Sequence, residues 1–173
     1  MKLTYFIVFC ICFVNTFSSN KKKLLISNKK YEDSLKIHLQ GIGCGISPTI
    51  SEAKDNIIKI EKWIKLHPDC ELAYHDLAMQ YYYLSCKDST IKNECYKKCL
   101  AYSLKDASFK PYKITAWSYS NVIMMCLLLG KCDDALFYFE KIKKLNPRGL
   151  KNELRRNTMG FLNKEMILRS CNK

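Results

Sequence analysis

The chain has 173 residues, 48% of them hydrophobic, and a formal net charge of +13 at pH 7. This length fits one domain, and the hydrophobic fraction is enough for a packed core, which excludes a chain that is disordered throughout. The positive charge indicates anionic partners such as nucleic acid, acidic lipid or an acidic protein. Lysine outnumbers arginine 25 to 4, and all four arginines lie in the last 26 residues.

Residues 1–18 have the pattern of a signal peptide. An apolar run from Tyr5 to Val14 follows Lys2, and it is shorter than the roughly 20 residues of a membrane-spanning helix. We expect cleavage near Ser19 and a mature protein in the secretory pathway or the extracellular space. Lysines also follow the run at residues 21–23, so an uncleaved N-terminal membrane anchor is the alternative.

Residues 19–50 are rich in lysine and glycine and are expected to be a linker. Three glycines alternate over residues 41–45, but no strand precedes them, so they indicate a turn rather than a phosphate-binding loop. A helical domain is expected over residues 51–170. Its first helix is predicted to begin at Ser47-Pro48 or at Ser51.

Six segments in this domain have helical spacing of their apolar residues. Pro68, Gly130 and Pro147 end three of them. Because no segment alternates like a strand, the sequence predicts an all-α fold. The segments cover approximately Ser51–His67, Glu71–Ser85, Glu94–Lys105, Ile114–Leu129, Asp133–Leu145 and Leu150–Arg169, the last of which is amphipathic and basic.

An internal repeat indicates how these helices are organised. The stretch Ile60–Pro68 returns 79 residues later as Phe139–Pro147, with five of nine positions identical. Repeats of this kind are typical of stacked helix pairs, each too small to bury its apolar face alone. Such arrays present surfaces, which favours a binding protein over an enzyme with a pocket.

The helix pairs resemble tetratricopeptide repeats, in which an aromatic, leucine and small-residue motif on a first helix precedes an A-x3-F motif and a proline on a second. The first-helix motif is matched by Tyr74-x2-Leu77-Ala78-x2-Tyr81 and by Tyr119-x2-Val122-Ile123-x2-Cys126. The second-helix motif is matched by Ala135-x3-Phe139 with Pro147, and more loosely by Cys95-x3-Cys99 and Asn56-x3-Ile60. The resemblance covers about Ser51–Arg169 and implies a right-handed α-solenoid of about three units.

This resemblance also implies a concave groove lined by first helices, which would bind another protein or peptide. Exposed Tyr, Trp and Met side chains are common at such binding sites. The competing interpretation is that several of these residues are core, since apolar stripes at helical spacing are usually buried. The groove candidates are His75, Asp76, Met79, Tyr82, Tyr83, Trp117, Ser120, Asn121, Met124, Leu127 and Leu128.

Some members of the family hold a C-terminal carboxylate with a clamp of Lys, Asn and Arg. Asn121, Lys151 and Arg155 stand at three of the five clamp positions, whereas His75 and Met79 stand at the other two. The resemblance therefore implies, as a narrower hypothesis, a fork between the arginine guanidinium and a carboxylate.

Eight cysteines follow the apolar N-terminal run, an even number that favours disulfides in an exported protein. Spacing alone does not give their connectivity, and Cys86 with Cys95 is our first expected pair. Cys95 and Cys99 share one helical face, but no second Cys or His pair stands at metal-ligand spacing. We expect no metal site and no cofactor.

No recognised context surrounds any Cys–His pair or pair of carboxylates, so we expect no enzyme. Three hypotheses remain. The first is an exported adaptor or effector that binds protein or peptide through the groove and the basic C-terminal helix. The second is an electrostatic binder of acidic lipid or nucleic acid, and the third is a small catalytic domain with a reactive cysteine. The phosphate contacts of the second would come from Arg148, Lys151, Arg155, Arg156, Lys164 and Arg169.

Overall fold

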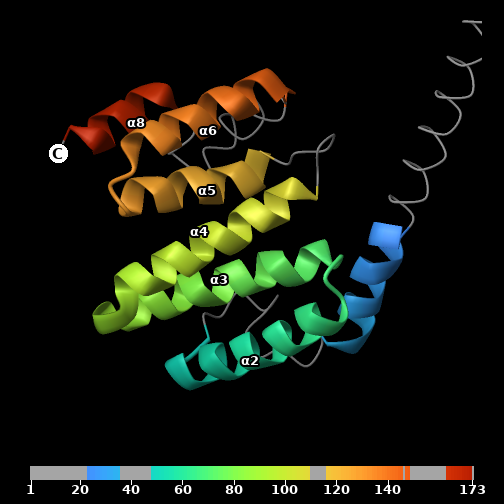
Figure 1. Cartoon of the computed structure of the whole chain (residues 1–173). Helices are drawn as coiled ribbons and strands as arrows, with labels where there is room; N and C mark the ends of the chain where they lie inside the picture. The colour runs from blue at the N-terminus through green and yellow to red at the C-terminus, as the bar shows by residue number, and fades with distance from the viewer. Residues whose placement is uncertain (1–22, 36–47, 110–115, 146, 149–162, 173) are drawn as a thin grey trace, which may run out of the picture.

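The computed structural model describes residues 23–35, 48–109, 116–145, 147–148 and 163–172, and these residues contain helices and no strand (Figure 1). The all-α prediction is therefore confirmed for this part of the chain. The expected signal peptide or anchor, residues 1–18, lies outside it. Besides a helix over residues 23–34, the elements are α2 (Ile50–Leu66), α3 (Glu71–Lys87), the 3-10 helix η2 (Ser89–Ile91), α4 (Lys92–Ser108), α5 (Ala116–Leu128), α6 (Cys132–Leu145) and α8 (Lys164–Cys171).

The helix ends follow local capping chemistry. α2 begins after Thr49 rather than at either predicted start, because Thr49 and Glu52 form a reciprocal capping box. Asn163 caps α8 by accepting a hydrogen bond from the Glu165 backbone N–H. α5 ends as predicted before Gly130, whose φ of 69° is accessible to glycine without a steric penalty.

The helices pack mainly against their neighbours in chain order, from α2 at one end to α6 and α8 at the other (Figure 1). α4 packs on both α3 and α5, and α8 packs on both α6 and α5. A buried hydrogen bond from Asn56 Nδ2 to Gln80 Oε1, 3.2 Å long, joins α2 to α3. The core therefore extends along the stack, between successive helices.

The repeated sequence positions lie in this core. On α3 and α5 all eight residues of the first-helix motif are buried, as are both motif residues on each of α2, α4 and α6. The nine-residue repeat also has matching ends, since α2 ends at Leu66 and α6 ends at the equivalent Leu145. These residues are Tyr74, Leu77, Ala78, Tyr81, Tyr119, Val122, Ile123, Cys126, Asn56, Ile60, Cys95, Cys99, Ala135 and Phe139.

A helix over residues 23–34 lies within the expected linker, so the linker prediction is wrong for this stretch. Tyr31 is fully buried, donates its hydroxyl to Asp76 Oδ2 at 3.1 Å and packs edge-on against Trp63. Asn28 accepts a hydrogen bond from the backbone N–H of Leu72. Because only Tyr31 and a few partly buried neighbours face inward, the lysine-rich composition hides the helix from a periodicity search.

A disulfide joins Cys132, the first residue of α6, to Cys171, the last residue of α8. The predicted Cys86–Cys95 pair is wrong in this structure, because both are free thiols. Cys95 faces the core from α4, whereas Cys86 is exposed at the end of α3. Their side chains therefore occupy different environments.

Candidate binding surface

The face of α3 that is not buried coincides with the expected groove positions. His75, Met79, Tyr82 and Tyr83 are partly exposed, while the residues between them are buried. Their successive spacings of four, three and one residues place them on one side of the helix. α3 therefore presents a narrow, mostly apolar and aromatic strip.

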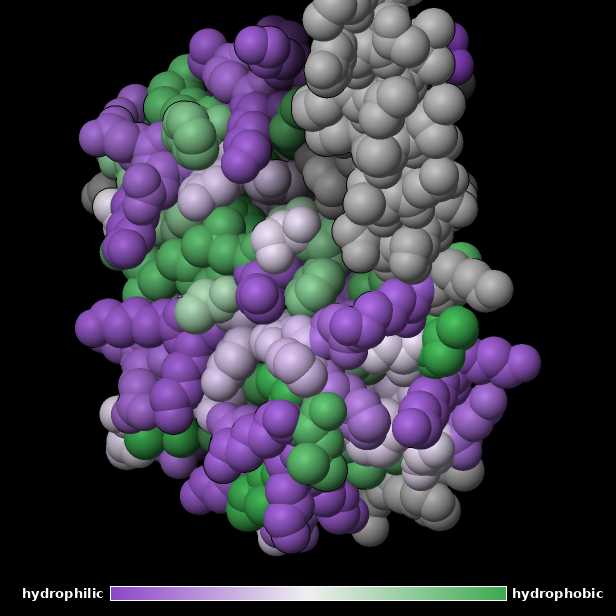
Figure 2. Space-filling model, turned by 45° about the vertical axis from the view of Figure 1, so that its right-hand side comes forward, coloured by the Kyte–Doolittle hydropathy of each residue, from purple (hydrophilic) through white to green (hydrophobic). Residues whose placement is uncertain are grey.

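α5 repeats this arrangement 45 residues further along the chain. Met124, Leu127 and Leu128 are partly or fully exposed and stand at the positions equivalent to Met79, Tyr82 and Tyr83. Figure 2 shows hydrophobic side chains interspersed with hydrophilic ones across the middle of one face of the molecule. We call His75, Met79, Tyr82, Tyr83, Met124, Leu127 and Leu128 together the α3–α5 strip.

The other groove candidates are not presented in this way. Asp76 and Ser120 are buried, and Asn121 is only 4% exposed. The side chain of Trp117 lies outside the described set, as do Lys151 and Arg155. Of the expected carboxylate clamp, therefore, the one described Asn is covered, and the two expected cations are not described.

A buried carboxylate holds the beginnings of α3 and α5 together. Asp106, near the end of α4, accepts a hydrogen bond on Oδ2 from Ser118 Oγ at 3.0 Å and contacts His75 Nδ1 at 3.3 Å. The His75 contact is a hydrogen bond when the imidazole carries its proton on Nδ1, because a carboxylate oxygen accepts. Asp106 therefore contacts both of the helices that carry the α3–α5 strip, close to the beginning of each.

This Ser, His and Asp set has the residue types of a hydrolase triad but a different order of contacts. In a triad the serine donates to the histidine, and the carboxylate binds the far side of the imidazole. Here Ser118 and His75 both bind the same oxygen of Asp106, and Ser118 is buried. The arrangement positions helices, and sequence spacing gave no signal for it because the three residues lie on three different helices.

Buried thiols are held in the protonated form. Burial raises the pKa of Cys99 to about 12 and that of Cys126 to about 11, and it also raises the pKa of Cys70 and Cys95. A protonated thiol is a poor nucleophile. These four cysteines therefore behave as small core residues.

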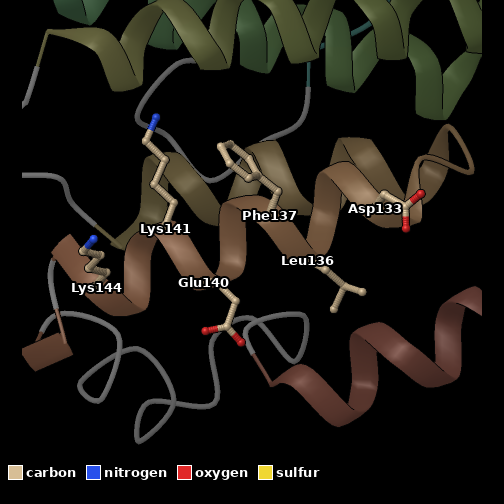
Figure 3. Close-up of a pocket in the computed structure, with 6 residues that line it drawn as sticks. All are labelled: Asp133, Leu136, Phe137, Glu140, Lys141 and Lys144. Carbon is tan, nitrogen blue, oxygen red and sulfur yellow. The ribbon is translucent and has the colours of Figure 1, made fainter.

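A depression with a volume of about 670 Å³ lies on α6. It is open, and Figure 3 shows that Phe137 and Lys141 project from one side of α6 while Leu136 and Glu140 project from the other. Lys141 Nζ lies 5.7 Å from the Tyr119 ring centroid and 5.9 Å from that of Tyr138. The contact with Tyr119 joins α6 to α5, whereas the contact with Tyr138 lies within α6.

The described residues contain no group of three or more His, Cys, Asp or Glu side chains that could hold a metal ion. None of their helices is long and apolar enough to cross a bilayer.

Comparisons with protein family models, with curated proteins and with solved structures find no match to this chain.

Proposed function

We propose that the protein is an exported, divergent tetratricopeptide-like module that binds a protein or peptide along the α3–α5 strip. The observation that carries the proposal is the matching exposure of two helices. Met79, Tyr82 and Tyr83 on α3 and their equivalents on α5 are accessible, whereas the motif positions of both helices are buried. The match does not extend to His75, whose equivalent Ser120 is buried. A strip of Tyr, Met and Leu suits a partner that buries apolar side chains.

The packing order supports the solenoid part of the proposal. Each helix contacts its successor in the chain, as stacked helix pairs do. The burial of Ala78 and Ala135 is consistent with the close helix approach that small residues allow. The Cys132–Cys171 disulfide supports export, because such bonds persist in oxidising compartments.

The electrostatic alternative at the C-terminus receives less support. Lys164 pairs with Glu140 at 3.3 Å, and Arg169 pairs with Glu165 on its own helix. Acidic neighbours reduce the attraction of these cations for phosphate. Of the other cations in that hypothesis only Arg148, which is exposed, lies within the described residues.

A peptide-display selection against the full chain tests the proposal. Selected peptides should bind the parent protein, and Tyr83→Ala or Met124→Ser should weaken binding about tenfold or more, the effect of removing a central interface residue. Phe137→Ala, at an exposed side chain on α6, is the matched control and should leave binding unchanged. An unchanged peptide affinity in both Tyr83→Ala and Met124→Ser would contradict the proposal.

Added salt separates the two modes of binding. Apolar binding along the strip should persist between low and high salt, whereas phosphate-type contacts weaken steeply. A peptide set that is uniformly acidic and released by moderate salt would favour the electrostatic alternative.

A further inference from the structure

The outward face of α2 combines exposed aliphatic side chains with lysines. Ile58 is 62% exposed and Leu66 is 75% exposed, although both are large and apolar. Helical spacing places Ile58 on the side opposite Asn56 and Ile60, which are buried against the rest of the stack, and Leu66 on the flank of that side. The exposed lysines on this outward side are Lys54, Lys59, Lys62 and Lys65.

The acids of α2 offset part of this charge. Glu52 is held in the capping box by Thr49, and Glu61 accepts a hydrogen bond from Tyr81 at 2.9 Å, so both are engaged within the molecule. Asp55 is exposed on the outward side, and Glu61, which is partly exposed, stands one helical turn from Ile58 and Lys65. Within the described part of the chain, none of the four lysines takes part in an ion pair.

We propose that the outward face of α2 docks the protein on an anionic lipid surface. Ile58, in the middle of α2, and Leu66, at its end, would enter the boundary between headgroups and acyl chains, while the lysines of the same face would contact lipid phosphates. The aliphatic stem of a lysine can lie along an apolar surface while its ammonium group stays in water. Lysines therefore suit a helix that lies at the level of the lipid headgroups. This pattern fits a bilayer better than a nucleic acid, because phosphate contacts alone leave Ile58 and Leu66 in water.

α2 is built to lie flat on such a surface without rearrangement. It forms the lower edge of the stack in Figure 1, with α3 on its inner side. Its start is fixed by Thr49, and its inner side is held by the Asn56–Gln80 hydrogen bond. The face is therefore formed before binding, and the α3–α5 strip on other helices stays available to a protein partner.

Sedimentation of the full chain with lipid vesicles tests this inference. We expect stronger binding to phosphatidylcholine vesicles that contain phosphatidylserine than to phosphatidylcholine alone. Lys59→Gln/Lys62→Gln should reduce the partition coefficient by about fivefold per lysine, the effect of one basic residue near a charged membrane. Lys97→Gln/Lys144→Gln removes the same charge from exposed positions on α4 and α6 and should have a much smaller effect.

The aliphatic residues require their own variant. Ile58→Asn/Leu66→Asn should weaken binding to the anionic vesicles, whereas Leu145→Asn, at an exposed residue of α6, should not. Vesicles of neutral lipid control for any contribution of the apolar run at residues 5–14. Binding unchanged by both α2 variants overturns the proposal, as does binding that depends on the lysines but not on Ile58 and Leu66. The latter outcome would mean a polyanion site instead of a bilayer site.

Failure here would leave the proposed peptide binding intact, because the two surfaces share no residue. The vesicle assay needs no peptide, and the peptide assay needs no lipid.

Discussion

The hydroxyl of Tyr31 donates to the carboxylate of Asp76 across 3.1 Å, and both side chains are buried. This bond ties the helix over residues 23–34 to α3. Burial, followed by the nearby Asp76 charge, raises the pKa of Tyr31. The phenol therefore remains a donor at any pH at which the protein is folded.

Tyr31→Phe should lower the free energy of unfolding by about 2 kcal/mol, the range for a hydrogen bond to a charged group. Urea denaturation followed by circular dichroism measures the change. Tyr83→Phe, at a partly exposed ring, is the control and should change stability little. Equal effects of the two substitutions would mean that the Tyr31–Asp76 hydrogen bond contributes nothing to the free energy of unfolding.

Asp106 should be the most sensitive polar residue of the described core. Asp106→Ala removes the common partner of His75 and Ser118 and should cost about 3 kcal/mol, the value of two hydrogen bonds to one buried carboxyl group. Ser118→Ala should cost about 1 kcal/mol, the value of a neutral hydrogen bond. Asp134→Ala, at an exposed acid of α6, should have almost no effect. A ranking in which Ser118→Ala exceeds Asp106→Ala would contradict the anchoring role.

The Cys132–Cys171 disulfide closes a loop of 39 residues. Chain entropy predicts that Cys132→Ser/Cys171→Ser lowers the free energy of unfolding by about 4 kcal/mol. A reducing agent should destabilise the parent protein by a similar amount and leave the double variant unaffected. Cys86→Ser, at a free cysteine, should not change stability.

Intact-mass analysis of the protein from its native source tests the export proposal. We expect a mass that lacks about eighteen residues and that rises on reduction by about two daltons for each disulfide. A full-length chain whose cysteines are all free would count against export and would require the sulfur pairing to be reassigned.

Alkylation should separate the free cysteines by burial. At neutral pH Cys86 should react at the rate of an ordinary exposed thiol, while the four buried cysteines react slowly. Peptide mapping after short labelling identifies the modified residue. A rate at Cys86 far above that of a free cysteine would revive the hypothesis of a catalytic thiol.

Alkaline pH should destabilise the fold. The pKa of Cys99 is raised from 9.0 to about 12 and that of Cys126 from 9.0 to about 11, mainly by burial. Their contribution to stability is therefore present below pH 9, where both states bind the proton. It is lost as pH rises from 9 toward these folded-state values, because only the unfolded state releases the proton. Urea titrations at several pH values should show this loss, and Cys126→Ala should make it smaller.

Sequence periodicity located the main helices well. The predicted segments over Glu71–Ser85 and Asp133–Leu145 differ from α3 and α6 by at most two residues at either end. Gly130 and the repeated IEKWIKL-like stretch mark turns and helix ends by local chemistry, which a single sequence contains. α4 is longer than predicted, because Asp88 caps a 3-10 turn that leads directly into it.

The relations between distant residues were not predictable in the same way. Cys171 pairs with Cys132 only because α8 returns across α6, and eight cysteines allow 105 full pairings. Asp106, Ser118 and Tyr31 are polar residues at inward positions, and a search for apolar periodicity counts each as exposed. Asn121 matched a groove position by register, yet the packing around it covers its side chain.

The sulfur bond between the two ends of the α6–α8 segment also determines how the molecule bears mechanical load. Tension applied to the chain beyond Cys171 passes through sulfur directly to Cys132, bypassing α8 and everything between the two cysteines. The terminal helix cannot be peeled away by a pull while this bond is intact. Force would instead reach the contact between α5 and α6, so the first rupture in a pulling experiment should fall there, and should move to α8 once the bond is reduced.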